Sequence, residues 1–324
     1  MTDLPSRRER RISEASRARA AAAEPATVAI DLPALQQEAA TRRRSARAAG
    51  AAPSTPGRAR IMGILNVTPD SFSDGGEHHR RDAAVTHARR LVADGADLVD
   101  VGGESTRPGA PRVPVDEEQR RVLPVVQDLV AEGITVSVDT MNAATAERSL
   151  ELGASIVNDV SGGLADPDMA RVVAASGAGF VVMHWRGHSD VMHRNAVYED
   201  AVEDVRRELE LRVAELIVLG VHPDQVVVDP GLGFAKHGRQ NWEILAGYER
   251  FASLGLPVLV AASRKRFLAG VGSDPDAPPR DRDLATAAIT LLAAERGAWG
   301  VRVHDPAPNR AVLDVWDAWR AARS

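Results

Sequence analysis

The sequence predicts an α/β fold, a (βα)8 TIM barrel preceded by a disordered N-terminal extension. Short apolar and β-branched runs alternate with amphipathic stretches from residue 60 onward. The alternation repeats eight times within about 265 residues, which matches such a barrel in count and in size. No Gly-rich dinucleotide turn follows the first strand, which makes a doubly wound open sheet the less favoured alternative.

The predicted strands are short apolar runs bounded by turn residues, as expected for parallel strands that are buried on both faces. The first of them ends at Asn66, where a long polar loop begins. The eight predicted strands are 60–66, 97–102, 134–139, 155–159, 179–183, 225–229, 257–262 and 300–304.

The predicted helices show the 3.6-residue spacing of apolar side chains that one buried face requires. The stretch 199–219 shows it most plainly, with Val202, Val205, Leu209 and Val213 on one face. Glycines follow several of these stretches and supply helix ends. The eight predicted helices are 81–94, 115–131, 142–152, 167–177, 199–219, 241–253, 281–296 and 307–322.

The composition excludes several classes of protein. With 324 residues and 44% hydrophobic content, the chain can bury a large core. It has no Cys, which excludes disulfides, thiolate metal sites and Cys nucleophiles. No apolar run approaches the roughly 20 residues of a membrane span, and the first residues lack an apolar signal core. We therefore expect a cytoplasmic protein with no membrane partner.

Residues 1–58 form the predicted extension, and residues 59–324 form the predicted barrel domain. The first 60 residues hold twelve Arg against six Asp and Glu, whereas the whole chain has a net charge of −5. They have almost no sustained apolar periodicity, which is typical of a disordered, solvated tail. An Arg-rich arm that binds nucleic acid is the alternative, but we expect no nucleic-acid partner.

Polar residues close every predicted strand. In a (βα)8 barrel these positions all face the carboxyl-terminal mouth, where barrel enzymes carry their active sites. Any one of them has a simpler explanation, since Asp139 could only cap the helix that follows it. Together the eight strand ends predict a polar-lined pocket. They are Asn66, Asp100, Asp139, Asn158 with Asp159, His184, Asp229, Ser263 with Arg264 and Lys265, and Arg302 with His304.

The predicted mouth has two chemical halves. The carboxylates and amide of Asp100, Asp139, Asn158 and Asp229 suit a flat, nitrogen-rich heterocycle. The cations Arg302, His304, Arg264 and Lys265, with Arg107 on the second loop, suit phosphate. Asn66 adds a neutral oxygen, and a Mg²⁺ carried by pyrophosphate takes few protein ligands. A heteroaromatic pyrophosphate is the substrate class that this pattern favours.

Several segments occur in the order found in one known family, and they cover the chain from about residue 60 to its end. They are 66–76 (NVTPDSFSDGG), 100–109 (DVGGESTRPG), 137–140 (SVDT), Asn158 with Asp159, 229–236 (DPGLGFAK), 263–265 (SRK) and 302–305 (RVHD). Together they resemble the dihydropteroate synthases of folate biosynthesis. The resemblance implies a transferase that condenses 6-hydroxymethyl-7,8-dihydropterin pyrophosphate with 4-aminobenzoate, uses Mg²⁺ and forms homodimers. It also implies a target of sulfonamides, although sensitivity stays open.

The resemblance assigns roles to residues of this chain. It places the pterin on Asp100, Asp139, Asn158, Asp229 and Lys265, of which Asp139, Asp229 and Lys265 are catalytic. It places the pyrophosphate on Asn66, Arg107, Arg302 and His304, with Asn66 at the Mg²⁺. It places the aminobenzoate on Phe72, Thr106, Pro108, Ser263 and Arg266. Many relatives have Ser where this chain has Arg266, so the contact to the aminobenzoate carboxylate stays open.

Some residues keep two interpretations. Phe72 stands alone on a polar loop and needs a ligand or another loop as partner. His184, His188 and His193 have irregular spacing, so a structural role is favoured over a metal cluster. Lys236 is either a pocket residue or a loop anchor. We also expect 67–78 to be the least ordered part of the barrel without ligand.

Two other functions compete with the synthase. A methyltetrahydrofolate-binding methyltransferase of the same superfamily would need only the pterin half of the mouth. A non-catalytic paralogue would be expected to lose Asn66, Phe72, Thr106 or Lys265, and the chain keeps all four. The sequence therefore favours an active synthase.

Overall fold

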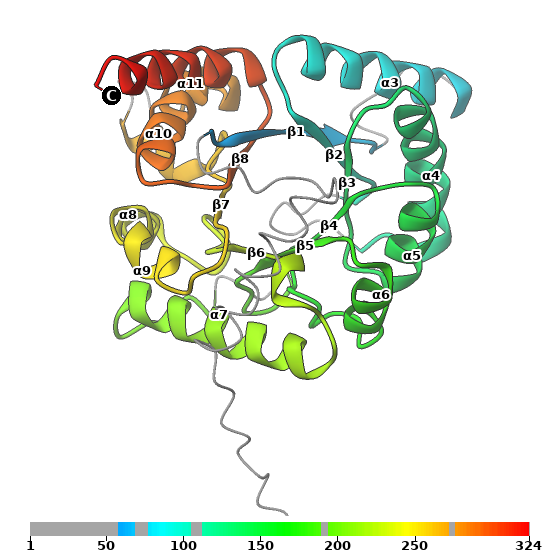
Figure 1. Ribbon diagram of the computed structural model, residues 1–324, viewed down its shortest axis with the longest axis horizontal. Coiled ribbons are helices and arrows are strands. Elements are labelled where there is room, and N and C mark those ends of the chain that lie inside the picture. The colour runs from blue at the N-terminus through cyan, green and yellow to red at the C-terminus, as the bar shows by residue number, and fades with distance from the viewer. Residues whose placement is uncertain (1–57, 69–76, 105–111, 189–193, 272–275, 324) are drawn as a thin grey trace, which may run out of the picture.

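The computed structural model describes residues 58–68, 77–104, 112–188, 194–271 and 276–323. These ranges do not include the predicted extension up to residue 57 or most of the loop 67–78. The expected disorder of both segments therefore stays a prediction. The described strands form one eight-stranded parallel sheet in the order β6-β5-β4-β3-β2-β1-β8-β7. The helices surround it, as Figure 1 shows, and the predicted barrel is confirmed.

The strands pair in sequence order around the barrel, with β1 also paired to β8. A single bridge between Val228 and Val258 joins β6 to β7 and closes the ring. The strands are β1 (Arg60–Asn66), β2 (Leu98–Gly102), β3 (Val136–Asp139), β4 (Ile156–Asp159), β5 (Gly179–Met183), β6 (Val226–Asp229), β7 (Leu259–Val260) and β8 (Gly300–Val303).

The helices lie outside the sheet and turn their apolar faces toward it. In α7, Val205, Leu209, Val213 and Leu216 are buried, and Asp200 caps the first turn by accepting from two backbone amides. No helix in the described ranges is both long and apolar enough to cross a membrane. The helices are α3 (Glu77–Ala93), α4 (Val115–Ala131), α5 (Ala143–Glu151), α6 (Met169–Ser176), α7 (Ala201–Val218), α8 (Gly238–Ala246), α9 (Tyr248–Ala252), α10 (Asp283–Glu295) and α11 (Pro306–Ala321).

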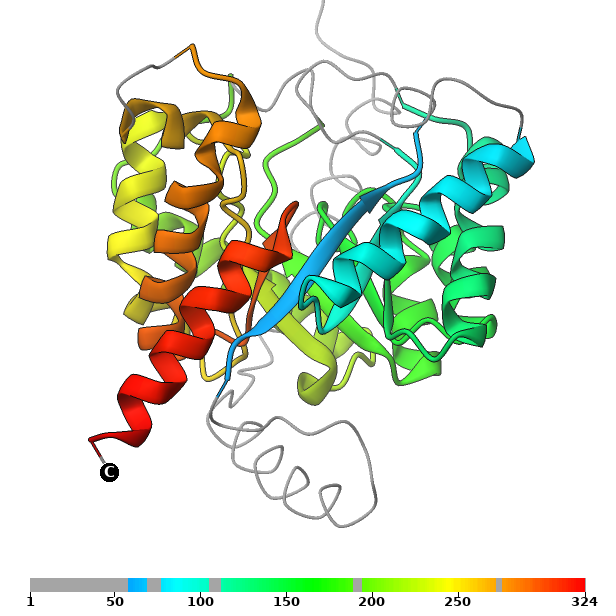
Figure 2. The same ribbon diagram turned by 90° about the horizontal axis from the view of Figure 1, so that it is seen from above.

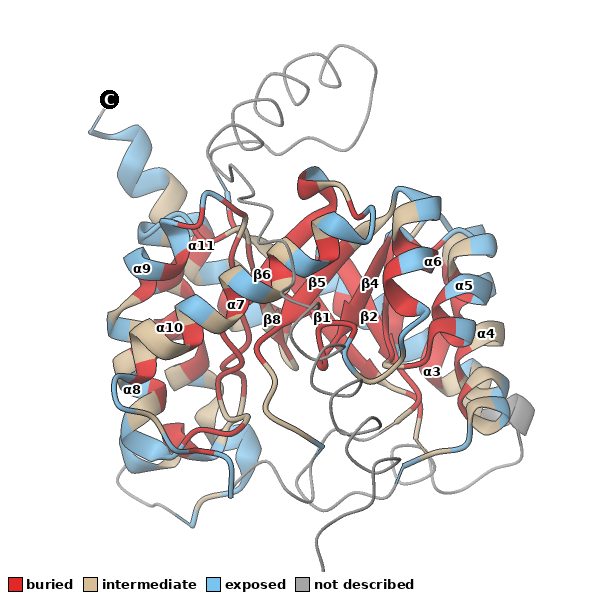
Figure 3. Ribbon diagram, turned by 90° about the horizontal axis from the view of Figure 1, so that it is seen from below, coloured by how far each residue is buried: buried red, intermediate tan, exposed pale blue. Residues whose placement is uncertain are grey.

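The core has two parts. Figure 3 shows the buried residues in red along the strands and the inner faces of the helices. The larger part fills the space between the sheet and the helices. The smaller part fills the barrel interior below the mouth with one apolar side chain from each of six strands. It consists of Met62, Leu98, Ile156, Val181, Val227 and Leu259. This packed layer forms a floor on which the polar strand ends stand.

Several elements differ from the predicted ones, and α3 begins at Glu77, four residues earlier than predicted. The helix predicted at 241–253 is broken into α8 and α9 at Gly247, where a Cβ atom would lie 2.6 Å from Val202 Cγ1 of α7. The strand predicted at 257–262 is shortened at both ends to β7, and Pro257 at the predicted start has no N–H for the ladder. Helix α10 begins only at Asp283, after a short 3₁₀ turn.

Helices α3 and α11 flank β1, as Figure 2 shows. Pro306 occupies the first turn of α11, and Asp305 caps that helix by accepting from Ala307 N at 3.2 Å. The chain therefore turns sharply from the end of β8 into α11, which keeps His304 at the rim of the barrel.

Candidate functional site

Strand alternation decides which strand-end side chains enter the barrel, because neighbouring residues of a strand point to opposite faces. Asn158 enters the mouth, where its Nδ2 donates to Asp100 Oδ2 at 2.9 Å. Asp159 turns the other way and accepts from Ser161 N at 2.7 Å and Gly163 N at 2.9 Å. Asp159 therefore orders the loop after β4, and of this predicted pair only Asn158 bonds within the mouth.

Arg302 joins two carboxylates at the centre of the mouth. Its Nε donates to Asp100 Oδ2 at 2.6 Å, and its Nη2 donates to Asp139 Oδ2 at 2.6 Å. Asp139 is not a helix cap, because Asn142 precedes α5. Three strands that are distant in sequence thus bring Asp100, Asp139 and Arg302 into one hydrogen-bonded group, to which Asn158 also belongs.

The environment of this group shifts its proton affinities. Burial raises the pKa of Asp139 to about 7, although the Arg302 guanidinium opposes the rise. Burial disfavours the charge of Arg302, yet Asp100 and Asp139 raise its pKa above the ordinary value. Asp100 is fully buried, and its Oδ1 has no hydrogen-bond partner within the described residues. Because such an acceptor costs about 1–3 kcal/mol, the group is suited to a ligand that brings N–H donors.

Asp229 and Lys265 face the same mouth from the other side of the barrel. Asp229 Oδ1 accepts from Gly231 N at 2.7 Å. Lys265 Nζ donates to the Leu232 carbonyl and lies 4.8 Å from the centre of the Phe234 ring. Burial lowers the pKa of Lys265 to about 8 and raises that of Asp229, and each charge opposes the shift of the other. Arg302 also interacts with Asp229, so all these groups belong to one site.

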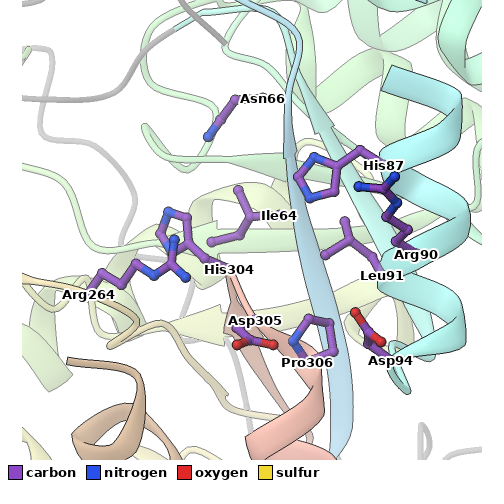
Figure 4. A pocket seen from close by; sticks show the side chains of 10 residues that line it. All are labelled: Ile64, Asn66, His87, Arg90, Leu91, Asp94, Arg264, His304, Asp305 and Pro306. Carbon is purple, nitrogen blue, oxygen red and sulfur yellow. The ribbon is translucent and has the colours of Figure 1, made fainter. Parts of the chain in front are cut away.

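A pocket of about 440 Å³ opens between β1, α3 and the start of α11. Figure 4 shows Asn66, His304 and Arg264 on one side of β1, with His87 and Arg90 of α3 on the other. Ser263 Oγ accepts from His304 N at 3.1 Å and lies 2.9 Å from His304 Nδ1. The Ser263 hydroxyl therefore contacts both the backbone amide and the imidazole of His304 and holds this side chain in place.

The remaining predicted residues are placed as follows. Arg264 makes a bidentate pair with Asp283 of α10, at 2.8 and 2.6 Å. Arg266 is exposed and begins the 3₁₀ helix Arg266–Val271. Four further residues lie outside the described ranges, namely Phe72, Thr106, Arg107 and Pro108.

His184 and Lys236 form a buried pair behind Asp229. Lys236 Nζ lies 3.1 Å from His184 Nδ1 and donates to the carbonyls of Gly231 and Phe234. His184 Nε2 lies 2.9 Å from Glu208 Oε2. The contacts of Lys236 are those of a loop anchor. His193 lies outside the described ranges, and within them no three His, Asp or Glu residues are arranged to hold a metal.

Comparison with known proteins assigns the chain to a family. Residues 62–304 match the sequence profile of the pterin-binding enzymes. Dihydropteroate synthase of Mycobacterium leprae is 50% identical over 80% of this chain and 93% of its own length. The chain belongs to the dihydropteroate synthase family. Enzymes of this family form the C–N bond of dihydropteroate, so the chain is a transferase of folate synthesis.

Solved structures of dihydropteroate synthases have the same fold. The Xanthomonas albilineans enzyme with 4-aminobenzoic acid has a TM-score of 0.76 and 43% identity, over 82% of this chain and 94% of that one. The same enzyme with 7,8-dihydropteroate has a TM-score of 0.74 and 40% identity, over 82% and 95%. The Yersinia pestis enzyme, solved as a sulfonamide complex, has a TM-score of 0.76 and 37% identity, over 82% and 95%.

Sequence reasoning missed one residue that shapes this dihydropteroate synthase site. Glu118 of α4 is 1% exposed and accepts from Thr140 Oγ1 at 2.8 Å, Asn142 Nδ2 at 2.8 Å and Thr145 Oγ1 at 2.6 Å. It therefore holds the segment directly after Asp139. In the sequence Glu118 is one of several acidic residues in a first helical turn, and no signal there marks it as buried.

Proposed function

We propose that the barrel mouth condenses 6-hydroxymethyl-7,8-dihydropterin pyrophosphate with 4-aminobenzoate, giving 7,8-dihydropteroate and pyrophosphate. The observation that carries this assignment to the mouth is the hydrogen-bonded group of Asp100, Asp139, Asn158 and Arg302, with Asp229 and Lys265 facing it. No other part of the described chain combines buried carboxylates, an amide and cations in this way.

In this proposal the pterin ring binds Asp139, Asn158, Asp229 and Lys265, with Asp100 beneath them. The carboxylates accept hydrogen bonds from the ring nitrogens, and Lys265 donates to a ring acceptor. Asp100 Oδ1 has no hydrogen-bond partner among the described residues, which supports a donor-rich ligand here. Because Asp139 and Asp229 are buried, their charges act strongly on a ring that becomes cationic during the reaction.

The pyrophosphate is proposed to lie toward Asn66, His304 and Arg302, with Arg107 contributing from the second loop. The pocket beside β1 supports this, because it joins the Asn66 amide to the His304 imidazole and the Arg264 guanidinium. One neutral oxygen from Asn66 fits a Mg²⁺ that keeps its waters and binds mainly through substrate phosphates. When bound, Mg²⁺ neutralises charge on the leaving pyrophosphate.

The proposed chemistry begins with loss of pyrophosphate, which leaves a cation at the exocyclic methylene of the pterin. His304 and Arg302 favour the departing anion, and the buried carboxylates favour the cationic ring. The arylamine of aminobenzoate then attacks the methylene carbon and releases a proton. Aminobenzoate is proposed to bind near Ser263, Arg266, Phe72, Thr106 and Pro108, with the Arg266 guanidinium as one candidate partner for its carboxylate.

We also propose a homodimer that forms through α10 and α11. The two helices pack together and expose apolar side chains, with Leu284 80% and Trp319 62% exposed. Leu284→Asp would then give a monomer in sedimentation at micromolar concentration. Val218→Asp is the matched control, because Val218 is 69% exposed on α7, and it would leave the dimer intact. The expected cytoplasmic location and lack of a nucleic-acid partner stay predictions.

Turnover by the purified protein tests the assignment of the mouth. Given the pterin pyrophosphate, Mg²⁺ and aminobenzoate, the wild-type protein should release pyrophosphate and form dihydropteroate in equal amounts. Lys265→Ala and Asp229→Ala should each abolish both products. Full activity in either variant would overturn the assignment, and absence of product from the wild type would overturn the proposed function.

A further inference from the structure

We propose that Lys236 is a positioning residue of this site, whose ammonium group holds the loop after β6 in the shape that sets Asp229 against Lys265. The inference rests on the proposed function and deepens it. Lys236 itself is 4% exposed and lies behind the loop, so it acts through the backbone.

The ammonium group of Lys236 is fully engaged. Its Nζ lies 3.0 Å from the Gly231 carbonyl, 3.1 Å from the Phe234 carbonyl and 3.1 Å from His184 Nδ1. An ammonium has three donors, so each is used. Three acceptors that converge on one point suit a compact ammonium, whereas the planar fork of Arg would not reach all three.

The loop held by Lys236 touches both proposed catalytic groups. Gly231 N donates to Asp229 Oδ1 at 2.7 Å, and the Leu232 carbonyl accepts from Lys265 Nζ. Gly231 and Leu232 are neighbours in this loop, and Lys236 Nζ donates to the Gly231 carbonyl. The chain has only two lysines among 40 basic residues, and both donate to this one short loop.

The loop needs such a clamp because part of it is strained. Ala235 has a φ of 46°, in the left-handed region that residues with a side chain rarely adopt. A backbone of this kind persists only where its surroundings hold it. Here Tyr198 Oη donates to the Ala235 carbonyl at 2.8 Å, and the Lys236 ammonium closes the turn on the other side.

Lys236 is held in place by His184, which in turn contacts Glu208. Glu208 accepts from Arg186 Nε at 3.0 Å and from His184 Nε2 at 2.9 Å, which leaves His184 Nδ1 as the acceptor for Lys236. Burial lowers the pKa of His184 to about 4, with Lys236 adding to the shift, so the imidazole is neutral. A buried ammonium is costly unless it is paired. This arrangement links it through His184 to the Glu208 carboxylate.

The test compares Lys236→Met with wild type in the full-length protein. Removing the clamp should weaken binding of 7,8-dihydropteroate, measured by calorimetry, by about 10- to 100-fold, since charge-assisted bonds are lost. The kcat/KM for the pterin pyrophosphate should fall by a similar factor. Arg239→Met is the matched control, because Arg239 is on the next helix with a side chain 91% exposed, and its affinity should stay within about twofold.

Glu208→Gln keeps the test decisive if Lys236→Met does not fold. It removes the distant counter-charge without touching the loop, and should weaken binding by about three- to tenfold. If Lys236 had a purely structural role, the variants would melt at a lower temperature but would bind 7,8-dihydropteroate with the wild-type Kd. This result would overturn the inference. If the wild type itself bound no dihydropteroate, the proposed function would fail instead.

Discussion

At the scale of single residues, Arg302 decides the charge state of the mouth. One guanidinium donates to the two buried carboxylates of Asp100 and Asp139 through bonds of 2.6 Å. Removing one partner of such a buried group leaves uncompensated charge, which costs more than the bonds themselves. The residue therefore matters both for folding and for the proposed binding of pterin.

Arg302→Met should lower the free energy of unfolding by about 3–5 kcal/mol. Turnover should fall at least about 100-fold, because Asp100 and Asp139 lose the group that aligns them. Urea denaturation and steady-state kinetics measure the two effects. Arg81→Met is the control, since Arg81 makes a bidentate pair with Asp128 on the surface, and it should cost about 0–1 kcal/mol. Equal losses in the two variants would contradict this account of Arg302.

The lowered pKa of Lys265 predicts how activity depends on pH. Burial lowers its pKa to about 8, so the ammonium is present below that pH and is lost above it. The kcat/KM for the pterin pyrophosphate should therefore fall as the pH rises through about 8. Lys265→Arg, which keeps its charge, should lose this fall near pH 8 in a profile normalised to its own maximum. An unchanged profile in Lys265→Arg would exclude Lys265 as the titrating group.

Lys236 contributes a second titration that must be separated from the first. Burial lowers its pKa to about 7, and the charges that act on it are Asp229, Lys265, Arg186 and Glu208, with His184 in contact. The profile of Lys236→Met should keep only the fall near pH 8.

At the scale of elements, the segments that follow the strands hold the site in place. Glu118 of α4 accepts three side-chain hydrogen bonds from the turn and helix that follow Asp139. The meeting of Asp100, Asp139, Asn158 and Arg302 was predictable, because polar strand ends stand out from apolar strands. The residues that support the site were not predictable. The burial of Glu118 and the helix break at Gly247 depend on which elements pack against each other.

Glu118→Gln should destabilise the protein by about 2 kcal/mol, because an amide cannot accept all three hydrogen bonds. It should also lower kcat/KM by shifting Asp139. Thermal denaturation and steady-state kinetics measure both effects. Glu117→Gln is the matched control, since Glu117 pairs with Arg120 and Arg121 at the surface, and it should change stability by less than about 1 kcal/mol. Wild-type stability in Glu118→Gln would contradict the proposed support.

At the scale of the whole molecule, eight strand and helix units bring residues together that are far apart in sequence. Asp100 and Arg302 are 202 positions apart and share a hydrogen bond. The sequence predicted this meeting because all parallel strands of a barrel end at the same mouth. The sequence alone could not predict the bonds from Arg302 to Asp100 and Asp139, because the register of the strands decides which side chains lie opposite each other.

Deleting residues 1–55 should leave turnover and stability unchanged. The deletion keeps Arg58, whose guanidinium pairs with Asp314 and Asp317 of α11, so the described barrel retains its contacts. Steady-state kinetics and thermal denaturation of the shortened chain check this. A loss of activity would assign the extension a part in catalysis.

The central claim is that the pterin binds at the barrel mouth, to Asp139, Asn158, Asp229 and Lys265. A crystal structure of the protein with 7,8-dihydropteroate tests it most directly. We predict the pterin ring within hydrogen-bonding distance of Asp139, Asn158 and Asp229, with Lys265 beside it and the aminobenzoate end directed toward Ser263. A ring bound away from these residues, or held by backbone groups alone, would contradict the account.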